Sequence, residues 1–117
     1  MKKLFIASLL VMFAATLLSM SIGYSNEPPV ATFVYRSFST TMSADFDGRA
    51  SHDNDGTIVS YSWDFGDGGI GSGAYVSHTY TTSGSYTVEL TVTDNNEATD
   101  IETRTFSCCG GDGGIWT

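Results

Sequence analysis

The chain has 117 residues, of which 13 are Asp or Glu and 5 are Lys or Arg, giving a formal net charge of −8. This length allows one globular domain, and so acidic a balance excludes nucleic-acid binding and adsorption to anionic membranes, because both partners are negatively charged. After residue 25 only three arginines remain against the 13 acids, so the net charge there is 3 − 13 = −10.

Residues 1–25 predict a secretory signal peptide. Lys2 and Lys3 precede an apolar run over 4–18, and the small residues Ser21, Gly23 and Ser25 then suit cleavage by signal peptidase. An uncleaved anchor is the alternative, but a run of about 15 residues is shorter than the roughly 20 that cross a bilayer. We therefore expect a secreted protein, extracellular, periplasmic or at the cell surface, with no membrane insertion after cleavage.

Apolar residues alternate with polar ones through residues 26–108, which predicts β-strands. Pro28 and Pro29 keep the start of this segment extended, and turn-forming clusters at 51–56, 66–73, 81–84 and 94–97 separate the runs. We therefore predict an all-β fold, an immunoglobulin-like antiparallel β-sandwich of about seven strands, with the least regular strand over 99–108. The alternating sets are Ala31, Phe33 and Tyr35; Met42, Ala44 and Phe46; Val59, Tyr61, Trp63 and Phe65; Val76, His78 and Tyr80; and Tyr86, Val88, Leu90 and Val92.

Five motifs in this order resemble the PKD (polycystic kidney disease) domain of secreted bacterial proteins. The resemblance covers residues 26–107 and implies a two-sheet sandwich that serves as an accessory module in proteases, chitinases, collagenases or surface proteins. The motifs are Asn26-x-Pro28-Pro29-x-Ala31-x-Phe33; Phe46-Asp47-x-x-Ala50-Ser51-x-Asp53-x-Asp55-Gly56; Ile58-x-x-Tyr61-x-Trp63-Asp64-Phe65-Gly66-Asp67-Gly68; His78-x-Tyr80; and Gly84-x-Tyr86-x-Val88-x-Leu90-x-Val92-x-Asp94.

A calcium site is expected at one end of the sandwich. The start of the first strand and two loops meet there in an immunoglobulin-like fold, and in this chain all three carry the acid and amide oxygens that Ca²⁺ prefers. Ordinary turn chemistry of Asp and Asn is the alternative. The resemblance to calcium-binding members adds weight and points to Asn26, Asp53 and Asp94, with Glu27 and Asp55 as further ligands.

An aromatic contact surface is a second expectation. Most tyrosines share the inward parity of their strands, but Tyr75 has the opposite parity from Val76, and Trp116 lies in the last segment. Tyr75 and Trp116 are therefore the predicted binding residues for an extracellular polysaccharide or protein.

No catalytic arrangement is evident in the sequence. Asp64 and Asp67 flank a turn, where turn formation and a loop hydrogen bond explain them better than paired acid–base catalysis, and His78 is expected to bond within the sandwich. No Ser/His/Asp order, Cys/His pair or zinc-ligand spacing occurs. We expect no enzymatic activity.

The adjacent cysteines Cys108 and Cys109 close the last strand, and residues 109–117 predict a flexible glycine-rich tail. Neighbouring residues are poorly placed for an unstrained bridge, so we expect one buried and one exposed thiol. The alternatives are a vicinal bridge or an intermolecular disulfide.

Together these features predict a secreted, non-catalytic PKD-like module for extracellular binding or spacing, stabilised by calcium. One alternative is an accessory fragment of a secreted hydrolase of protease or chitinase type. Another is a surface subunit that self-associates through a disulfide or an edge strand.

Overall fold

The computed structural model describes residues 23, 25–109 and 116, so most of the predicted signal peptide and tail lie outside the described residues. The described residues form seven strands and no helix, and none of them belongs to a helix long and apolar enough to cross a membrane. The strands are β1 (Val34–Phe38), β2 (Ser43–Asp47), β3 (Ile58–Asp64), β4 (Ile70–Ser72), β5 (Tyr75–Thr79), β6 (Gly84–Asp94) and β7 (Thr99–Cys108).

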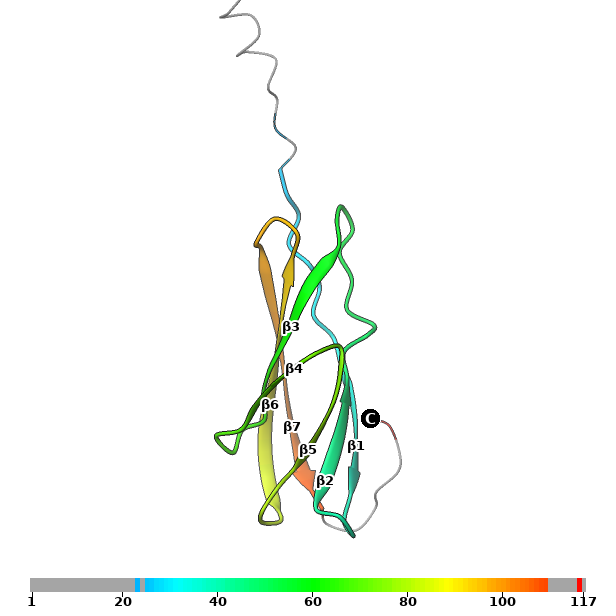
Figure 1. The fold of residues 1–117 in the computed structure, drawn as a ribbon, viewed down its shortest axis with the longest axis vertical. Coiled ribbons are helices and arrows are strands. Elements are labelled where there is room, and N and C mark those ends of the chain that lie inside the picture. Colours follow the sequence, from blue (N-terminus) through cyan, green and yellow to red (C-terminus); the bar gives the residue numbers. More distant parts are fainter. Residues whose placement is uncertain (1–22, 24, 110–115, 117) are drawn as a thin grey trace, which may run out of the picture.

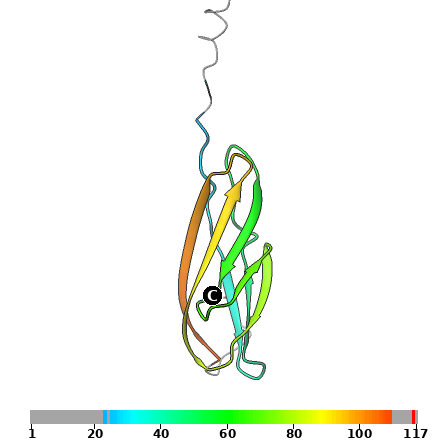
Figure 2. The same cartoon turned by 60° about the vertical axis from the view of Figure 1, so that its left-hand side comes forward.

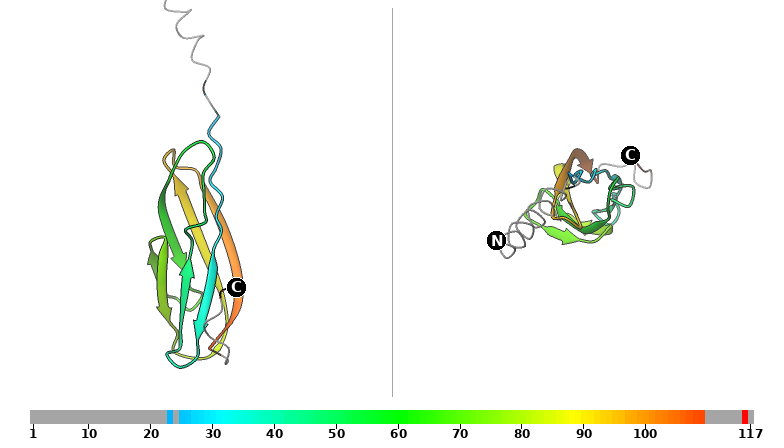
Figure 3. Two further views of the ribbon diagram at one scale, coloured as in Figure 1. Left: turned by 90° about the vertical axis from the view of Figure 1, so that its right-hand side faces the viewer. Right: turned by 90° about the horizontal axis from the view of Figure 1, so that it is seen from above.

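The strands form two antiparallel sheets that face each other (Figure 1). One sheet has the order β1-β2-β5 and the other the order β4-β3-β6-β7. Figure 2 shows β7, β6 and β3 side by side in the larger sheet, and the view from above in Figure 3 shows the strands arranged around a central core. The predicted sandwich of about seven strands is confirmed.

Aromatic side chains from both sheets fill the core. Trp63 is 1% exposed, its ring packs against Phe33 at 5.1 Å and Phe46 at 5.7 Å between centroids, and its indole Nε1 donates to the Gly73 carbonyl at 2.8 Å. The inward parity of β6 explains the apolar partners Val88, Leu90 and Val92, because alternate side chains of a strand face one side. Large aromatics bury much apolar area each, so these few residues carry most of the core.

Two expectations about the strands were wrong in detail. Val59 was assigned to the inner face, but the register shifts between Ile58 and Ser60, and this irregularity leaves Val59 62% exposed while Ile58 packs on the core. The short strand β4 lies inside the segment that we assigned entirely to a turn, and it pairs with β3 through Trp63 and Gly71.

The chain enters and leaves the sandwich at opposite ends. The segment before β1, the β2–β3 loop and the β6–β7 loop lie together at one end, at the top of Figure 1. The last residues of β7 lie at the other end, beside the β1–β2 and β5–β6 turns (Figure 1).

Candidate functional site

The segments that carry the five predicted calcium ligands lie together at one end of the sandwich. Asn26 Nδ2 donates to Asp94 Oδ2 at 2.8 Å, and the Glu27 amide donates to Asp55 Oδ2 at 2.9 Å. Asp53 sits in the same loop as Asp55 and accepts from the Asp55 amide at 3.3 Å. We call Asn26, Glu27, Asp53, Asp55 and Asp94 the acidic end.

Asp94 is the buried anchor of the acidic end. It is 1% exposed, and its Oδ1 accepts from the amides of Asn96 and Ala98, both at 2.8 Å. The hydrogen bond from Asn26, followed by those from the two amides, lowers the pKa of Asp94. Asp94 is therefore an anion under most conditions and fixes the β6–β7 turn.

One carboxylate oxygen of Asp53 lacks a partner in the described structure. Its Oδ2 is buried and finds no hydrogen-bond partner among the described residues. Burial and the neighbouring carboxylates of Asp55 and Asp94 raise the pKa of Asp53. A Cβ placed on Gly56 would lie 2.6 Å from this oxygen, so a side chain at this position would displace the Asp53 carboxylate.

These observations fit a divalent cation, which would satisfy the buried oxygen and offset the repulsion between the acids. Asp53 and Asp55 would supply carboxylate oxygens, and Asn26 and Asp94 would close the site from the other two segments. Within the part of the chain that the structure describes, no three His, Cys, Asp or Glu side chains are already grouped for metal binding. Calcium would therefore have to draw the loops together, and calcium binding stays a prediction.

The two predicted contact residues, Tyr75 and Trp116, also meet. Tyr75 is 43% exposed and Trp116 39% exposed, and their rings contact each other edge to face, with centroids 6.3 Å apart. Both belong to the outer side of the β1-β2-β5 sheet, because Trp116 stacks on Arg36 of β1 and the Tyr75 hydroxyl bonds to Asp45 of β2. We call this surface the aromatic face; it comprises Arg36, Phe38, Asp45, Arg49, Tyr75, Ser77 and Trp116.

Asp45 organises the polar groups of the aromatic face. It accepts hydrogen bonds from Ser77 Oγ at 2.6 Å, Tyr75 Oη at 2.9 Å and Arg36 Nη2 at 3.2 Å. Burial of the carboxyl opposes ionisation, but these three bonds outweigh it and lower the pKa of Asp45. The tyrosine and the arginine are therefore held in fixed positions by one carboxylate.

The sequence analysis did not identify the arginines of this face. The Arg36 guanidinium lies 4.8 Å from the ring centroid of Phe38 and 4.8 Å from that of Trp116, and the Arg49 guanidinium lies 5.3 Å from the centroid of Tyr75. Their outward parity on β1 and beyond β2 was readable, since Arg36 alternates with the core residue Tyr35. Which aromatic ring each arginine would stack on depends on strand pairing, which the sequence does not give.

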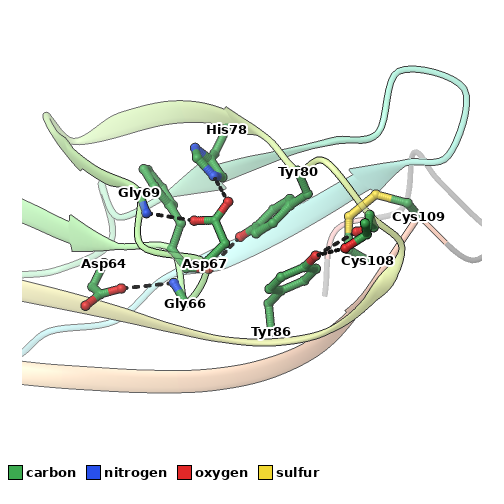
Figure 4. A network of polar contacts seen from close by, with 11 residues as sticks. Asp64, Gly66, Asp67, Gly69, His78, Tyr80, Tyr86, Cys108 and Cys109 are labelled. Atoms are coloured by element: carbon green, nitrogen blue, oxygen red, sulfur yellow. Dashed lines mark hydrogen bonds and ion pairs between the residues drawn. A yellow bond between two sulfur atoms is a disulfide. The ribbon is translucent and has the colours of Figure 1, made fainter.

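Asp64 and Asp67 have the structural roles that we expected. Asp64 Oδ1 accepts from the Gly66 amide and Asp67 Oδ1 from the Gly69 amide, each at 2.9 Å. Asp67 Oδ2 lies 2.7 Å from His78 Nε2 (Figure 4), and the imidazole stacks on Phe65 with 4.1 Å between the ring centroids. Burial opposes ionisation of Asp67, yet the bonds from His78 and Gly69 lower its pKa.

A tyrosine hydrogen bond and the two cysteines lie at the end of the sandwich where β7 ends. Tyr86 Oη donates to the Thr82 carbonyl at 2.7 Å, the tyrosine corner expected for such a sandwich. Cys108 is 1% exposed and is bonded to Cys109 (Figure 4). The expected pair of free thiols is thus replaced by the vicinal bridge, the alternative we considered.

Comparison with known proteins agrees with this architecture. The family model described as PKD domain matches residues 26–108. Collagenase ColA of Clostridium perfringens is 49% identical over 59 residues, which are 50% of this chain and 5% of that protein. The pre-pro-metalloprotease PrtV of Vibrio cholerae is 47% identical over 58 residues, 50% of this chain and 6% of that protein. The chain thus spans only a small part of the length of these curated relatives.

Solved structures show the same fold. The PKD1 domain of Vibrio anguillarum Epp is 44% identical, with a TM-score of 0.67 over 72% of this chain and 96% of that one. A chain from a study of the promiscuous specificity of carbohydrate-binding modules of the β-sandwich superfamily is 35% identical, with a TM-score of 0.69 over 77% of this chain and 38% of that one.

Proposed function

This chain belongs to the PKD domain family, and from that premise we propose that it is a secreted, non-catalytic accessory module that attaches to an extracellular polymer, either a polysaccharide or a structural protein. Two kinds of relative support the proposal: segments of collagenases and a metalloprotease, and a chain from a study of carbohydrate-binding modules. The domain matches only a few per cent of those proteases, which is consistent with a module that assists a separate catalytic part.

The observation that carries the proposal is the exposed ring of Tyr75, with its hydroxyl fixed on Asp45. A flat ring beside fixed polar groups suits a polymer that presents both an apolar surface and hydroxyl or carbonyl groups, since binding sites combine aromatic surface with a few placed polar groups. Two of the three arginines that remain after residue 25 lie on this same face. The aromatic face therefore offers both cationic and aromatic contacts, although the protein as a whole is acidic.

Calcium has a separate, stabilising role in the proposal. The acidic end lies away from the aromatic face, at the end of the sandwich where the chain enters (Figure 1). Calcium there would join the segment before β1 to the two loops and would hold that segment against the sandwich. The proposed contact with polymer does not pass through the ion.

A spacer function is the second candidate, favoured by the position of the two ends. The chain enters the sandwich at one end and leaves β7 at the other (Figure 1), so the module adds its full length between whatever flanks it. A spacer needs no ligand, which makes the two candidates separable.

Co-sedimentation of the purified protein with insoluble chitin, cellulose and collagen in millimolar calcium tests the proposal. We expect retention on one polymer, and at least tenfold weaker retention of Tyr75→Ala. Ile101→Ala is the matched control, because Ile101 is 53% exposed on the other sheet and its truncation should leave retention unchanged. Absence of retention on all three polymers, even for the Trp116→Ala variant used below, would leave the spacer function.

A further inference from the structure

We propose that Trp116 is an intramolecular cap on the aromatic face, which competes with the bound polymer for Tyr75 and Arg36. This inference rests on the proposed function. It changes the expected role of Trp116 from a contact residue to an internal competitor.

Among the described residues, the Trp116 ring contacts two that the polymer would use. Its ring lies against Tyr75 at 6.3 Å and over the Arg36 guanidinium at 4.8 Å. The Phe38 ring also lies 4.8 Å from the Arg36 guanidinium. Trp116 therefore adds a second aromatic ring to this cation, and it contacts Tyr75, the aromatic side chain proposed to meet the polymer.

The cap leaves one group of the face unsatisfied. Arg36 Nε is buried and has no hydrogen-bond partner among the described residues. An indole offers only a donor, so Trp116 can stack on Arg36 but cannot accept its proton. A sugar hydroxyl or a peptide carbonyl can accept it, and an unsatisfied buried donor is costly. An external ligand can therefore satisfy Arg36 Nε, whereas Trp116 cannot. This difference favours displacement of Trp116 by the polymer.

Trp116 and the aromatic face belong to the same chain, so docking is intramolecular and does not depend on the protein concentration. A weak contact is therefore sufficient and leaves both capped and open states populated. The apparent affinity for polymer is then lower than that of the open face by the fraction that is open.

Comparison of Trp116→Ala with the unmodified protein on the chitin, cellulose and collagen panel tests the competition. We expect Trp116→Ala to be retained about two- to tenfold more tightly on the polymer that the unmodified protein binds. Equal retention of the two proteins would overturn the cap and leave the proposed function standing. Weaker retention of Trp116→Ala would also overturn it and make Trp116 a contact residue. If neither protein is retained, the proposed function fails, and the competition fails with it.

Tryptophan fluorescence tests the docking itself, without any polymer. Trp63 is 1% exposed, so the acrylamide-quenchable emission comes from Trp116 and disappears in Trp116→Phe. We expect Arg36→Met to increase quenching of Trp116, with Ile101→Ala as the control that leaves it unchanged. Quenching in the unmodified protein equal to that of a free tryptophan derivative would show that Trp116 is not docked, and would overturn the cap.

Discussion

His78 and Asp67 form a bridge between the two sheets: Nε2 and Oδ2 are 2.7 Å apart, with one residue on β5 and the other in the turn after β3. The side chains are about one-fifth exposed, so water weakens the bridge only in part. It holds the turn against Phe65, on which the imidazole stacks.

We expect Asp67→Asn to lower the free energy of unfolding by about 1–2 kcal/mol, because the charge-assisted bond to His78 is replaced by a weaker one. Asp64→Asn is the matched control, since Asp64 makes the same kind of turn bond but faces solvent without a histidine. Urea denaturation at pH 6 measures both variants. Equal midpoints would show that the bridge contributes nothing.

Gly66 and Gly68 lie in the same turn, but glycine is favoured at the two positions for partly different reasons. Both have positive φ, 82° and 92°, which disfavours any other residue. A Cβ at Gly66 would also lie 2.4 Å from the Thr87 carbonyl oxygen, whereas at Gly68 nothing lies within 4 Å. We expect Gly68→Ala to cost about 1 kcal/mol and Gly66→Ala about 3 kcal/mol or more, measured by thermal melts. Similar losses at the two positions would contradict the close approach of Thr87.

Calcium should raise the melting temperature of the unmodified protein. With an affinity in the range of extracellular modules, about 10⁻⁴–10⁻³ M, 1 mM calcium adds about 0.4–1.4 kcal/mol. We expect Asp53→Asn to abolish this increase and, in chelator, to be more stable than the unmodified protein, because its raised pKa means that the ionised carboxylate is unfavourable in the fold. Glu89→Gln, an exposed acid on the sheet, controls for overall charge. A melting temperature that does not change with calcium would refute the site.

The stability should fall below about pH 4. The hydrogen bonds from Arg49 to Asp47 and from Asn26 to Asp94 lower the pKa of each acid, and the unfolded carboxyls titrate near 3.9. Between these values the unfolded state binds more protons, so the free energy of unfolding decreases as the pH falls through the folded pKa. The pKa of Asp53 is shifted in the opposite direction, since it is raised in the fold. Its protonation at low pH therefore offsets part of the lost free energy of unfolding. Urea midpoints at pH 7, 4 and 3 measure the change, and identical midpoints would contradict these shifts.

The vicinal bridge makes a prediction about assembly. With Cys108 bonded to Cys109, the purified protein should run as a monomer on non-reducing gels and should take up no iodoacetamide until it is reduced. Cys108→Ser with Cys109→Ser serves as the unreactive control. A band of twice the mass that collapses on reduction would instead support the intermolecular disulfide.

The sequence predicted features that depend on one strand at a time. Parity alone placed Trp63 and Leu90 inside and Tyr75 outside, because side chains alternate along a strand. The same rule failed at Val59, where the register shift exchanges inside and outside, and it missed β4, whose three residues Ile70–Ser72 contain a glycine and lack β-strand alternation.

Contacts between distant segments were predicted only where a general rule of the fold says which segments lie close together. The rule that loops converge at one end brought Asn26, Asp53 and Asp94 together, but not the missing partner of Asp53 Oδ2. The contact between Trp116 and Tyr75 had no such rule, since it joins the last segment to β5. The two residues were therefore predicted separately and found together.

The opposite placement of the two ends has a mechanical consequence. Tension applied through Asn26 and Cys108 acts along the strands, so the segment before β1 must slide past the sheets before any strand can peel away. Three contacts of this segment resist the sliding at the same time. They are the Val30–His52 β-bridge, the hydrogen bond from the Ala31 amide to Asp100, and the hydrogen bond from Arg104 to the Phe33 carbonyl. Bonds loaded in shear share the force, whereas bonds that are unzipped break one at a time, so the sandwich resists tension applied along its strands.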